Sequence, residues 1–362
     1  MQGILNISLK DIKSNWISLN NASKGKAAAV VKANAYGMGM IKITQTLIEA
    51  GCNYFYVANL CEGIQLRKKF KSENIKIAVF EGFLNGTEQT YKKFRLNPII
   101  NNLDQLKRLK TFVNQGFKIK TILNIDTGMN RLGLNQNETN LLLQNKELLD
   151  FVEWDFIMSH LANSNDIKNE DNFKQLNKIL QFSKIIPNIK LSLANSGGIM
   201  LGSDFCLDQT RPGIGLYGID SFGNNIELNF KTLKFPVSLY APVIQIRDVN
   251  IDEKVSYGGI YITKRKSRLA TIGIGYADGW LRLLRPNSTF SIMQKKCNII
   301  GNITMDSFVL DITNLKEKLL KEGEYICLLD KTNIKNILNN LDLISYELLT
   351  LMSNRLLRKH NS

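Results

Sequence analysis

The chain of 362 residues has few of the features that mark a secreted, disulfide-linked or membrane-spanning protein. Its five cysteines are scattered and include no CxxC pair, so neither a disulfide framework nor a zinc knuckle is indicated. No apolar run is long enough to cross a bilayer, and the N-terminus has no basic segment that leads into an apolar stretch. We therefore expect a soluble, cytoplasmic protein without a membrane partner.

Histidine is scarce as well, since only His160 and His360 are present and no HExxH-type spacing occurs. We therefore expect no metal site. The net charge of +15 offers one alternative reading, a basic nucleic-acid-binding protein. However, the basic residues gather only in short pieces such as Arg67-Lys68-Lys69, without interleaved aromatics or a recognisable nucleic-acid module, so no nucleic-acid partner is expected.

Short apolar runs alternate with helix-period segments over the first two thirds of the chain. Helices are predicted at 41–50, 61–71, 103–115 and 169–185, two of them closed by glycine and one stopped by proline. The short apolar runs number eight and are predicted to be strands. Eight strands with helices between them, over roughly 200 residues, are typical of a (β/α)₈ barrel. The predicted strands are 27–31, 54–58, 76–80, 98–100, 118–125, 154–159, 190–194 and 213–217.

The pattern changes after residue 217, where a polar stretch precedes turn-separated, strand-like segments. We predict an α/β plus all-β protein, with an N-terminal (β/α)₈ TIM-type barrel over residues 1–228 and a C-terminal β-rich domain over 229–362. A C-terminal helix is expected over about residues 343–357. The first few residues of the chain are assigned either to the barrel or to packing on the β-domain.

Lys32 ends the apolar run 27–31, just before two glycines that break the strand. It is thus predicted at the C-terminal end of a barrel strand, where catalytic groups of this fold collect. Burial among alanines and valines lowers the pKa of a lysine and frees its amine to form a Schiff base with an aldehyde. The stretch alone also fits a lysine that merely marks where the strand meets water.

Glycine-rich segments follow the last two predicted barrel strands. Loops at these positions often bind phosphate through backbone amides and a hydroxyl, and Ser196 with the amides of Gly213 and Ile214 fits that role. Each feature alone is equally typical of an ordinary turn or helix cap. A phosphate site together with an activated lysine suggests pyridoxal 5'-phosphate as the cofactor.

A set of motifs runs in order along nearly the whole chain. They are VKANAYG at 31–37, DTGMNRLG at 126–133, RPGIGLYG at 211–218, SYG at 256–258, GYADG at 275–279, MD at 305–306 and ISYE at 344–347. Together they closely resemble the alanine racemases, which are pyridoxal-phosphate enzymes of fold type III. The resemblance implies two-base racemisation of L-alanine and D-alanine and a supply of D-alanine for cell-wall peptidoglycan.

By this resemblance, Lys32 would hold the cofactor and take the α-proton of the D-enantiomer, while Tyr257 would act on the opposite face for the L-enantiomer. His160 and Arg211 resemble the pair beside that tyrosine, whose positive charge would favour the phenolate. Arg211 would also face the pyridine nitrogen.

The remaining site residues are implied in the same way. Arg131 resembles the arginine that contacts the ring hydroxyl and the substrate carboxylate. The phosphate contacts would be Tyr36, Ser196, Gly213, Ile214 and Tyr346. Tyr276 and Met305 would line the substrate end, and in this family they come with Tyr257 from the partner subunit, which implies a homodimer with shared active sites.

The sequence departs from the commoner pattern of the family at three positions: Met38 replaces a frequent histidine, Thr304 a frequent cysteine, and Asn124 a lysine that is carbamylated in many members and braces the arginine matched by Arg131. Asn124 cannot be carbamylated. Its amide, or a bound anion such as chloride, would therefore brace Arg131.

Other readings stay open at this point. A racemase with a broader amino-acid range needs a wider entrance, which the sequence does not define. A related basic amino-acid decarboxylase would leave Tyr257 without a role and would pair the pyridine nitrogen with a carboxylate, in place of Arg211. A non-catalytic pyridoxal-phosphate carrier needs Lys32 and the phosphate loops but neither a second base nor a β-domain.

Overall fold

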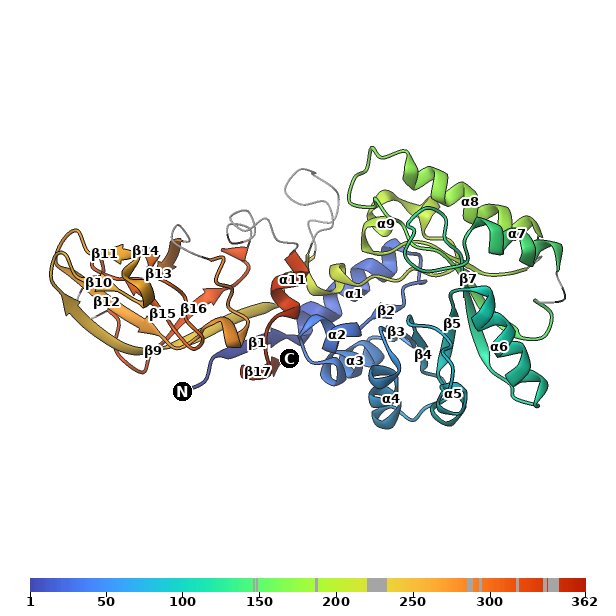
Figure 1. Cartoon of the computed structure of the whole chain (residues 1–362), viewed down its shortest axis with the longest axis horizontal. Coiled ribbons are helices and arrows are strands. Elements are labelled where there is room, and N and C mark those ends of the chain that lie inside the picture. The colour runs from blue at the N-terminus through green and yellow to red at the C-terminus, as the bar shows by residue number, and fades with distance from the viewer. Residues whose placement is uncertain are drawn as a thin grey trace. The chain divides into compact units, whose positions relative to one another are not determined.

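The computed structural model describes residues 1–145, 147, 149–185, 188–219, 233–284, 289–292, 295–316, 319–334, 337 and 345–362. The chain divides into two compact units (Figure 1). The barrel unit consists of Asp11–Ala35 and Met40–Lys234, and the β unit of Met1–Lys10, Tyr36–Gly39 and Phe235–Ser362. The predicted boundary between residues 228 and 229 lies outside the described residues.

The barrel unit is built on seven parallel strands that pair in chain order. Their apolar sequences, such as the fully buried YFYV of β3, are typical of strands that are covered on both faces. The strands are β2 (Ala29–Val30), β3 (Tyr54–Val57), β4 (Lys76–Val79), β5 (Asn97–Ile100), β6 (Lys120–Asn124), β7 (Glu153–Met158) and β8 (Leu191–Ser192).

Helices follow the strands and lie around them in Figure 1, in the arrangement of a β/α barrel. Several begin with an asparagine cap, and Asn135 with Glu138 forms a complete capping box. The helices are α1 (Leu9–Ala22), α3 (Met40–Glu49), α4 (Leu60–Lys69), α5 (Glu88–Phe94), α6 (Leu103–Asn114), α7 (Gln136–Gln144), α8 (Asp171–Ile185) and α9 (Ser196–Leu201).

The predicted eighth strand at 213–217 is wrong, because Ile214–Tyr217 forms the 3₁₀ helix η3. Pro212 has no N–H to continue a ladder, and the glycines after it favour a turn. The barrel is instead closed a few residues earlier, where Gln209 bridges Ser192 of β8 and Thr210 bridges Ala27 before β2. The predicted barrel architecture is confirmed, with its last strand reduced to these bridges.

The β unit is a sheet, antiparallel except at its β1–β17 edge, and is organised around the long strand β9 (Val237–Val249), on which β1, β12 and β16 pair. The strand order is β13-β14-β15-β12-β9-β1-β17, and β10 with β11 forms a separate hairpin. The bounds are β1 (Ile4–Ser8), β10 (Lys254–Val255), β11 (Tyr261–Ile262), β12 (Ser267–Ile272), β13 (Thr289–Ile292), β14 (Lys295–Ile300), β15 (Phe308–Asp311), β16 (Tyr325–Leu329) and β17 (Leu357–Asn361).

Both chain ends lie in this sheet. β1 pairs antiparallel with β9 and parallel with β17. The C-terminal helix predicted over 343–357 is wrong in its second half, because α11 (Ser345–Thr350) is followed by a turn and then by β17. Residues 343 and 344 lie outside the described part of the chain.

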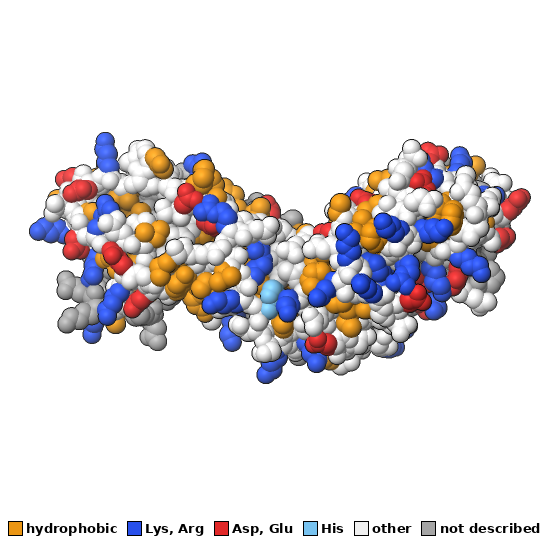
Figure 2. All heavy atoms as spheres, turned by 90° about the horizontal axis from the view of Figure 1, so that it is seen from below, with side chains coloured by type: hydrophobic (Ala, Val, Ile, Leu, Met, Phe, Trp, Pro, Cys, Tyr) orange, Lys and Arg blue, Asp and Glu red, His pale blue; other side chains and the backbone are white. Residues whose placement is uncertain are grey.

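The surface of the protein mixes charges of both signs. Figure 2 shows lysine and arginine side chains over both units, with acidic, apolar and uncharged side chains between them. Within the described residues, no helix combines the length and the apolar character that crossing a bilayer requires. No group of three or more His, Cys, Asp or Glu side chains in this part of the chain is placed to hold a metal ion.

Candidate active site

Lys32 begins α2 (Lys32–Tyr36), a short turn directly after β2. The four residues after Lys32 all have left-handed backbone, with φ of 51° at Ala33 and 53° at Asn34, Ala35 and Tyr36. Such a conformation costs about 1–2 kcal/mol per non-glycine residue, and strain of this kind collects at functional sites. The turn is held by its contacts: Ala33 N donates to Glu62 Oε1 at 2.6 Å, and Met40 N donates to Asn34 Oδ1 at 2.8 Å.

The environment of Lys32 favours its neutral amine. Burial lowers the pKa of Lys32, the positive charge of Arg131 lowers it further, and Glu62 opposes both effects. The Nζ atom lies over the ring of Phe80, 5.6 Å from its centroid. A lysine of lowered pKa in such surroundings is a nucleophile for a carbonyl group.

Arg211 is fully buried at the barrel end of the loop that closes the sheet. Its two terminal nitrogens donate to Ser192 Oγ and to the Ser159 carbonyl, and its guanidinium lies 6.0 Å from the ring centroid of Tyr56. Its Nε–H is buried without any acceptor among the described residues. Burying a donor without an acceptor costs free energy, so we expect the Nε–H to donate to a group outside the described residues.

His160 is neutral at physiological pH. Burial lowers the pKa of His160 to about 3, and the charges of Arg211, Arg131 and Lys32 act in the same direction. Its Nε2 lies 3.4 Å from Asn195 Nδ2, which can only donate, so Nε2 is assigned as the acceptor. The interpretation that His160 supplies positive charge is therefore revised, because Arg211 carries the charge of that pair alone.

The predicted phosphate loops meet at Ser196, the first residue of α9. Its Oγ accepts hydrogen bonds of 3.0 Å from the amides of both Gly213 and Gly215. The hydroxyl proton of Ser196 is thus left to point elsewhere, and the amide of Ile214 has no acceptor among the described residues. The structure brings Ser196, Gly213 and Ile214 together. The amide of Gly213, however, already donates its hydrogen bond to Ser196 Oγ.

Arg131 lies in the loop after β6 and is exposed. The loop is shaped by Asp126, whose Oδ1 accepts from the amides of Gly128 and Met129 at 2.8 Å. Among the described residues, Arg131 forms no ion pair. Asn124 is buried, and its Nδ2 donates to Asn101 Oδ1 at 2.8 Å. A guanidinium only donates, so Asn124 could contact Arg131 only through its Oδ1, and no such hydrogen bond occurs among the described residues.

The other predicted residues belong to the β unit and fall into two groups. Tyr36 and Tyr346 contact each other edge to face, with ring centroids 6.3 Å apart, and burial raises the pKa of Tyr36. Tyr276 and Met305 lie on adjoining loops, since Tyr276 N donates to the carbonyl of Thr304 at 3.1 Å.

Tyr257, Tyr276 and Met305 are among the large apolar or aromatic side chains that are exposed in the described residues, at 77%, 43% and 52% of their surface. Tyr257 itself lies in the one-turn 3₁₀ helix η5 (Tyr257–Gly259), and its backbone carbonyl accepts from Asn302 Nδ2 at 2.9 Å.

Three residues of the barrel site were missed at the sequence level: Glu62, Tyr56 and Phe80. Tyr56 and Phe80 stack with centroids 5.3 Å apart and lie beneath Arg211 and Lys32. In the sequence they look like ordinary strand aromatics. Glu62 had a detectable signal, since it lies three residues after Asn59 in a capping pattern, but its contact with Ala33 depends on the fold.

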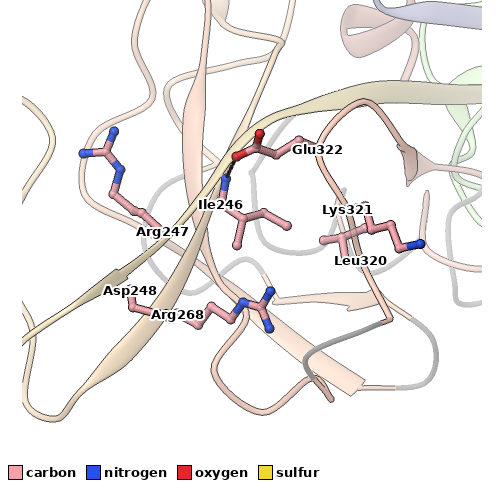
Figure 3. Close-up of a pocket in the computed structure, with 7 residues that line it drawn as sticks. All are labelled: Ile246, Arg247, Asp248, Arg268, Leu320, Lys321 and Glu322. Atoms are coloured by element: carbon pink, nitrogen blue, oxygen red, sulfur yellow. Dashed lines mark hydrogen bonds between the residues drawn. The ribbon is translucent and has the colours of Figure 1, made fainter.

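A hollow in the β unit lies apart from all of these residues (Figure 3). Ile246 N donates to Glu322 Oε1 at 2.8 Å across it, and the side chains of Arg247 and Lys321 point to opposite sides. None of the predicted site residues is among those that line it, which are Ile246, Arg247, Asp248, Arg268, Leu320, Lys321 and Glu322.

The chemistry of the barrel residues fits pyridoxal phosphate. Lys32 offers an amine of lowered pKa for the aldehyde, Arg211 Nε offers a buried donor for the ring nitrogen, and Ser196 with Ile214 offers donors for the phosphate. A barrel with such a lysine and an added β unit defines the class of barrel-type pyridoxal-phosphate enzymes.

Comparison with known proteins narrows this class to one family. Residues 7–221 match the description "Alanine racemase, N-terminal domain", and residues 236–360 match "Alanine racemase, C-terminal domain". The chain belongs to the alanine racemase family. It is 37% identical to the alanine racemase of Brucella canis over 368 residues, which cover 98% of this chain and 93% of that protein. The corresponding protein of Rickettsia canadensis is 36% identical, with 98% of both chains covered.

Solved structures agree with the sequence comparison. The alanine racemase of Bartonella henselae, whose crystal structure has covalently bound pyridoxal phosphate, matches with a TM-score of 0.94 at 36% identity over 100% of both chains. The biosynthetic alanine racemase of Pseudomonas aeruginosa matches with a TM-score of 0.87 at 26% identity, over 100% of this chain and 99% of that one.

Proposed function

We propose that the protein interconverts L-alanine and D-alanine with pyridoxal 5'-phosphate held by Lys32. The observation that carries this proposal is that one site holds a lysine of lowered pKa and a fully buried arginine, Arg211, whose Nε–H has no acceptor in the part of the chain that the structure describes. When bound, pyridoxal phosphate supplies an electron sink that eases removal of the α-proton of an amino acid.

Arg211 sets the strength of that sink. A guanidinium donates a hydrogen bond but does not readily give up its proton, so a ring nitrogen facing Arg211 stays neutral. Its two terminal nitrogens donate to Ser192, Ser159 and Leu193, and Nε–H is the donor that has no acceptor among the described residues and so can face the ring. The arrangement also disfavours a basic amino-acid decarboxylase, in which a carboxylate would face that nitrogen.

Racemisation requires one proton carrier on each face of the α-carbon. We assign Lys32 Nζ to the face from which the D-enantiomer loses its proton, and Tyr257 Oη to the opposite face. Tyr257 is an inefficient base unless a positive neighbour favours its phenolate, and Arg211 is the cation that we assign to this task because His160 is neutral. Arg131 would orient the substrate carboxylate.

We further propose a homodimer in which Tyr257, Tyr276 and Met305 serve the cofactor held by the partner subunit. The support is that these three side chains are exposed on the single chain although they are large and apolar or aromatic. Aromatic residues and methionine are enriched at protein interfaces. A monomer would then be inactive, because it lacks the second proton carrier.

The physiological role that we propose is the supply of D-alanine for cell-wall peptidoglycan, in the cytoplasm. The five cysteines are all free thiols in the structure, as is usual in a reducing compartment.

The test is to incubate the protein with L-alanine in heavy water and to follow optical rotation together with deuterium at the α-carbon. Wild type should racemise L-alanine and incorporate deuterium, and Lys32→Ala and Tyr257→Phe should each lose racemisation by at least about a hundredfold. Tyr325→Phe, a matched change at a partly exposed tyrosine of β16, should leave the rate unchanged. L-alanine that stays optically pure with wild-type protein would refute the proposed function.

A further inference from the structure

The C-terminal strand β17 holds the loop that carries Tyr36. Arg358 and His360 are alternate residues of this strand and so project from the same face. Arg358 Nε donates to the carbonyl of Gly37 at 2.8 Å, and His360 Nε2 donates to the carbonyl of Met38 at 2.8 Å. Two consecutive carbonyls of the segment Tyr36–Gly39 are thus fixed by two side chains of one strand.

Arg358 connects this loop to a second one. Its terminal nitrogens donate to the carbonyl of Ser353 at 3.0 Å and to that of Met352 at 2.7 Å, both in the turn that follows α11. A planar guanidinium can span several carbonyls in this way because its five N–H groups have a fixed geometry. One side chain therefore links the residue after Tyr36 to the end of the helix that carries Tyr346.

The loop and α11 are packed too closely to tolerate a shift. A Cβ atom at Gly37 would lie 2.3 Å from the carbonyl oxygen of Leu349 in α11, so only glycine fits there. The ring contact between Tyr36 and Tyr346, at 6.3 Å and 85°, lies beside this packing. The relative position of the two phenols depends on where Arg358 and His360 place the loop.

We propose that Arg358 and His360 are positioning residues for the phosphate end of the cofactor site, acting through Gly37 and Met38 on the Tyr36–Tyr346 pair. The inference rests on the proposed function, which makes these two phenols contacts of the cofactor phosphate. Neither positioning residue carries a proton of the reaction. Their loss should weaken cofactor binding and leave the chemical step intact once the site is saturated with cofactor.

The test measures the Kd for pyridoxal phosphate by absorbance titration, and kcat and KM for L-alanine at saturating cofactor. Arg358→Lys keeps the positive charge but loses the planar fork, and His360→Ala loses its donor. Each should raise the Kd by about tenfold, the equivalent of one lost hydrogen bond, and leave kcat and KM within about twofold of wild type. His360→Gln keeps a donor at similar reach and should restore the Kd.

Lys359→Ala is the matched control, since Lys359 lies between the two residues on β17 and is exposed. It should leave the Kd unchanged. The proposal is overturned if Arg358→Lys and His360→Ala bind pyridoxal phosphate as wild type does. It is also overturned if kcat at saturating cofactor falls as much as affinity, or if His360→Gln fails to restore the affinity, because the strand would then serve only folding.

The same data separate this proposal from the proposed function. If wild-type protein binds pyridoxal phosphate and racemises alanine, and the variants have the same Kd as wild type, only the positioning role is refuted. Wild-type protein that binds pyridoxal phosphate without racemising alanine refutes the proposed function, while a raised Kd in the variants still supports the positioning role. Wild-type protein that does not bind pyridoxal phosphate refutes both.

Discussion

The side-chain amide of Asn124 donates to Asn101 Oδ1 at 2.8 Å, and Asn101 in turn donates to the carbonyl of Phe80 at 3.0 Å. Asn124 Nδ2 thus donates inside the barrel. A guanidinium only donates, so Asn124 could brace Arg131 only through its Oδ1. The described residues show no hydrogen bond between these two side chains. Of the two ways in which Arg131 was expected to be braced, the bound anion stays a prediction.

We therefore predict that activity depends on chloride. Replacing chloride by a bulky organic anion at constant ionic strength should raise the KM for L-alanine by about two- to fivefold, because an exposed ionic contact contributes about 0.5–1 kcal/mol. An Arg131→Lys variant should be less active and lose most of this dependence. A KM that is the same in both salts would show that Arg131 needs no anion.

Gly37 should not tolerate a side chain. Gly37→Ala introduces strain at φ of +83° and places a methyl group 2.3 Å from a backbone oxygen, so we expect it to lower the free energy of unfolding by about 2–4 kcal/mol. Gly116→Ala is the control, because φ there is +87° but no atom lies within 4 Å, and it should cost only about 1 kcal/mol. Urea denaturation of both variants checks the difference; equal losses would mean that the contact with α11 is unimportant.

Local sequence patterns predicted seven of the barrel strands well. Strands that are buried on both faces appear in the sequence as short apolar runs, and such a run is recognised from its own residues alone. The eighth strand failed where this local signal is ambiguous. An apolar stretch after Pro212 reads as a strand, but the residues that close the barrel are Gln209 and Thr210, which are polar and pair only through isolated bridges. Nothing in their own sequence marks them as part of a sheet.

The site shows the same limit. Lys32 could be predicted as a site residue because the signal lies in adjacent residues, the apolar run 27–31 that precedes it and places it at the end of a buried strand. Arg358 and His360 act on a loop more than 300 residues earlier, at separations of 321 and 322 residues, so no spacing in the sequence connects them to Tyr36. The neutrality of His160 likewise depends on charges that only the fold brings near it.

His160 should make the protein sensitive to acid. Its pKa is lowered from 6.5 to about 3 in the folded chain, so the unfolded chain binds the extra proton below about pH 6.5 and stability falls as the pH falls. Between pH 6.5 and pH 5 this single group should remove about 2 kcal/mol from the free energy of unfolding. In cofactor-free protein, His160→Gln should flatten the pH dependence by that amount; an unchanged slope in urea titrations would mean that His160 is already protonated or solvated.

The pKa of Lys32 should respond in opposite directions to its two charged neighbours. Arg131 lowers it, so Arg131→Met should raise it and leave less neutral amine at a given pH; Glu62 raises it, so Glu62→Gln should lower it. The rate at which cofactor-free protein forms a borohydride-reducible adduct with pyridoxal phosphate reports the neutral amine. Its pH midpoint should shift upward in Arg131→Met and downward in Glu62→Gln. Shifts of the same sign in both variants would show that the two changes act through the strained turn after Lys32 and not through charge.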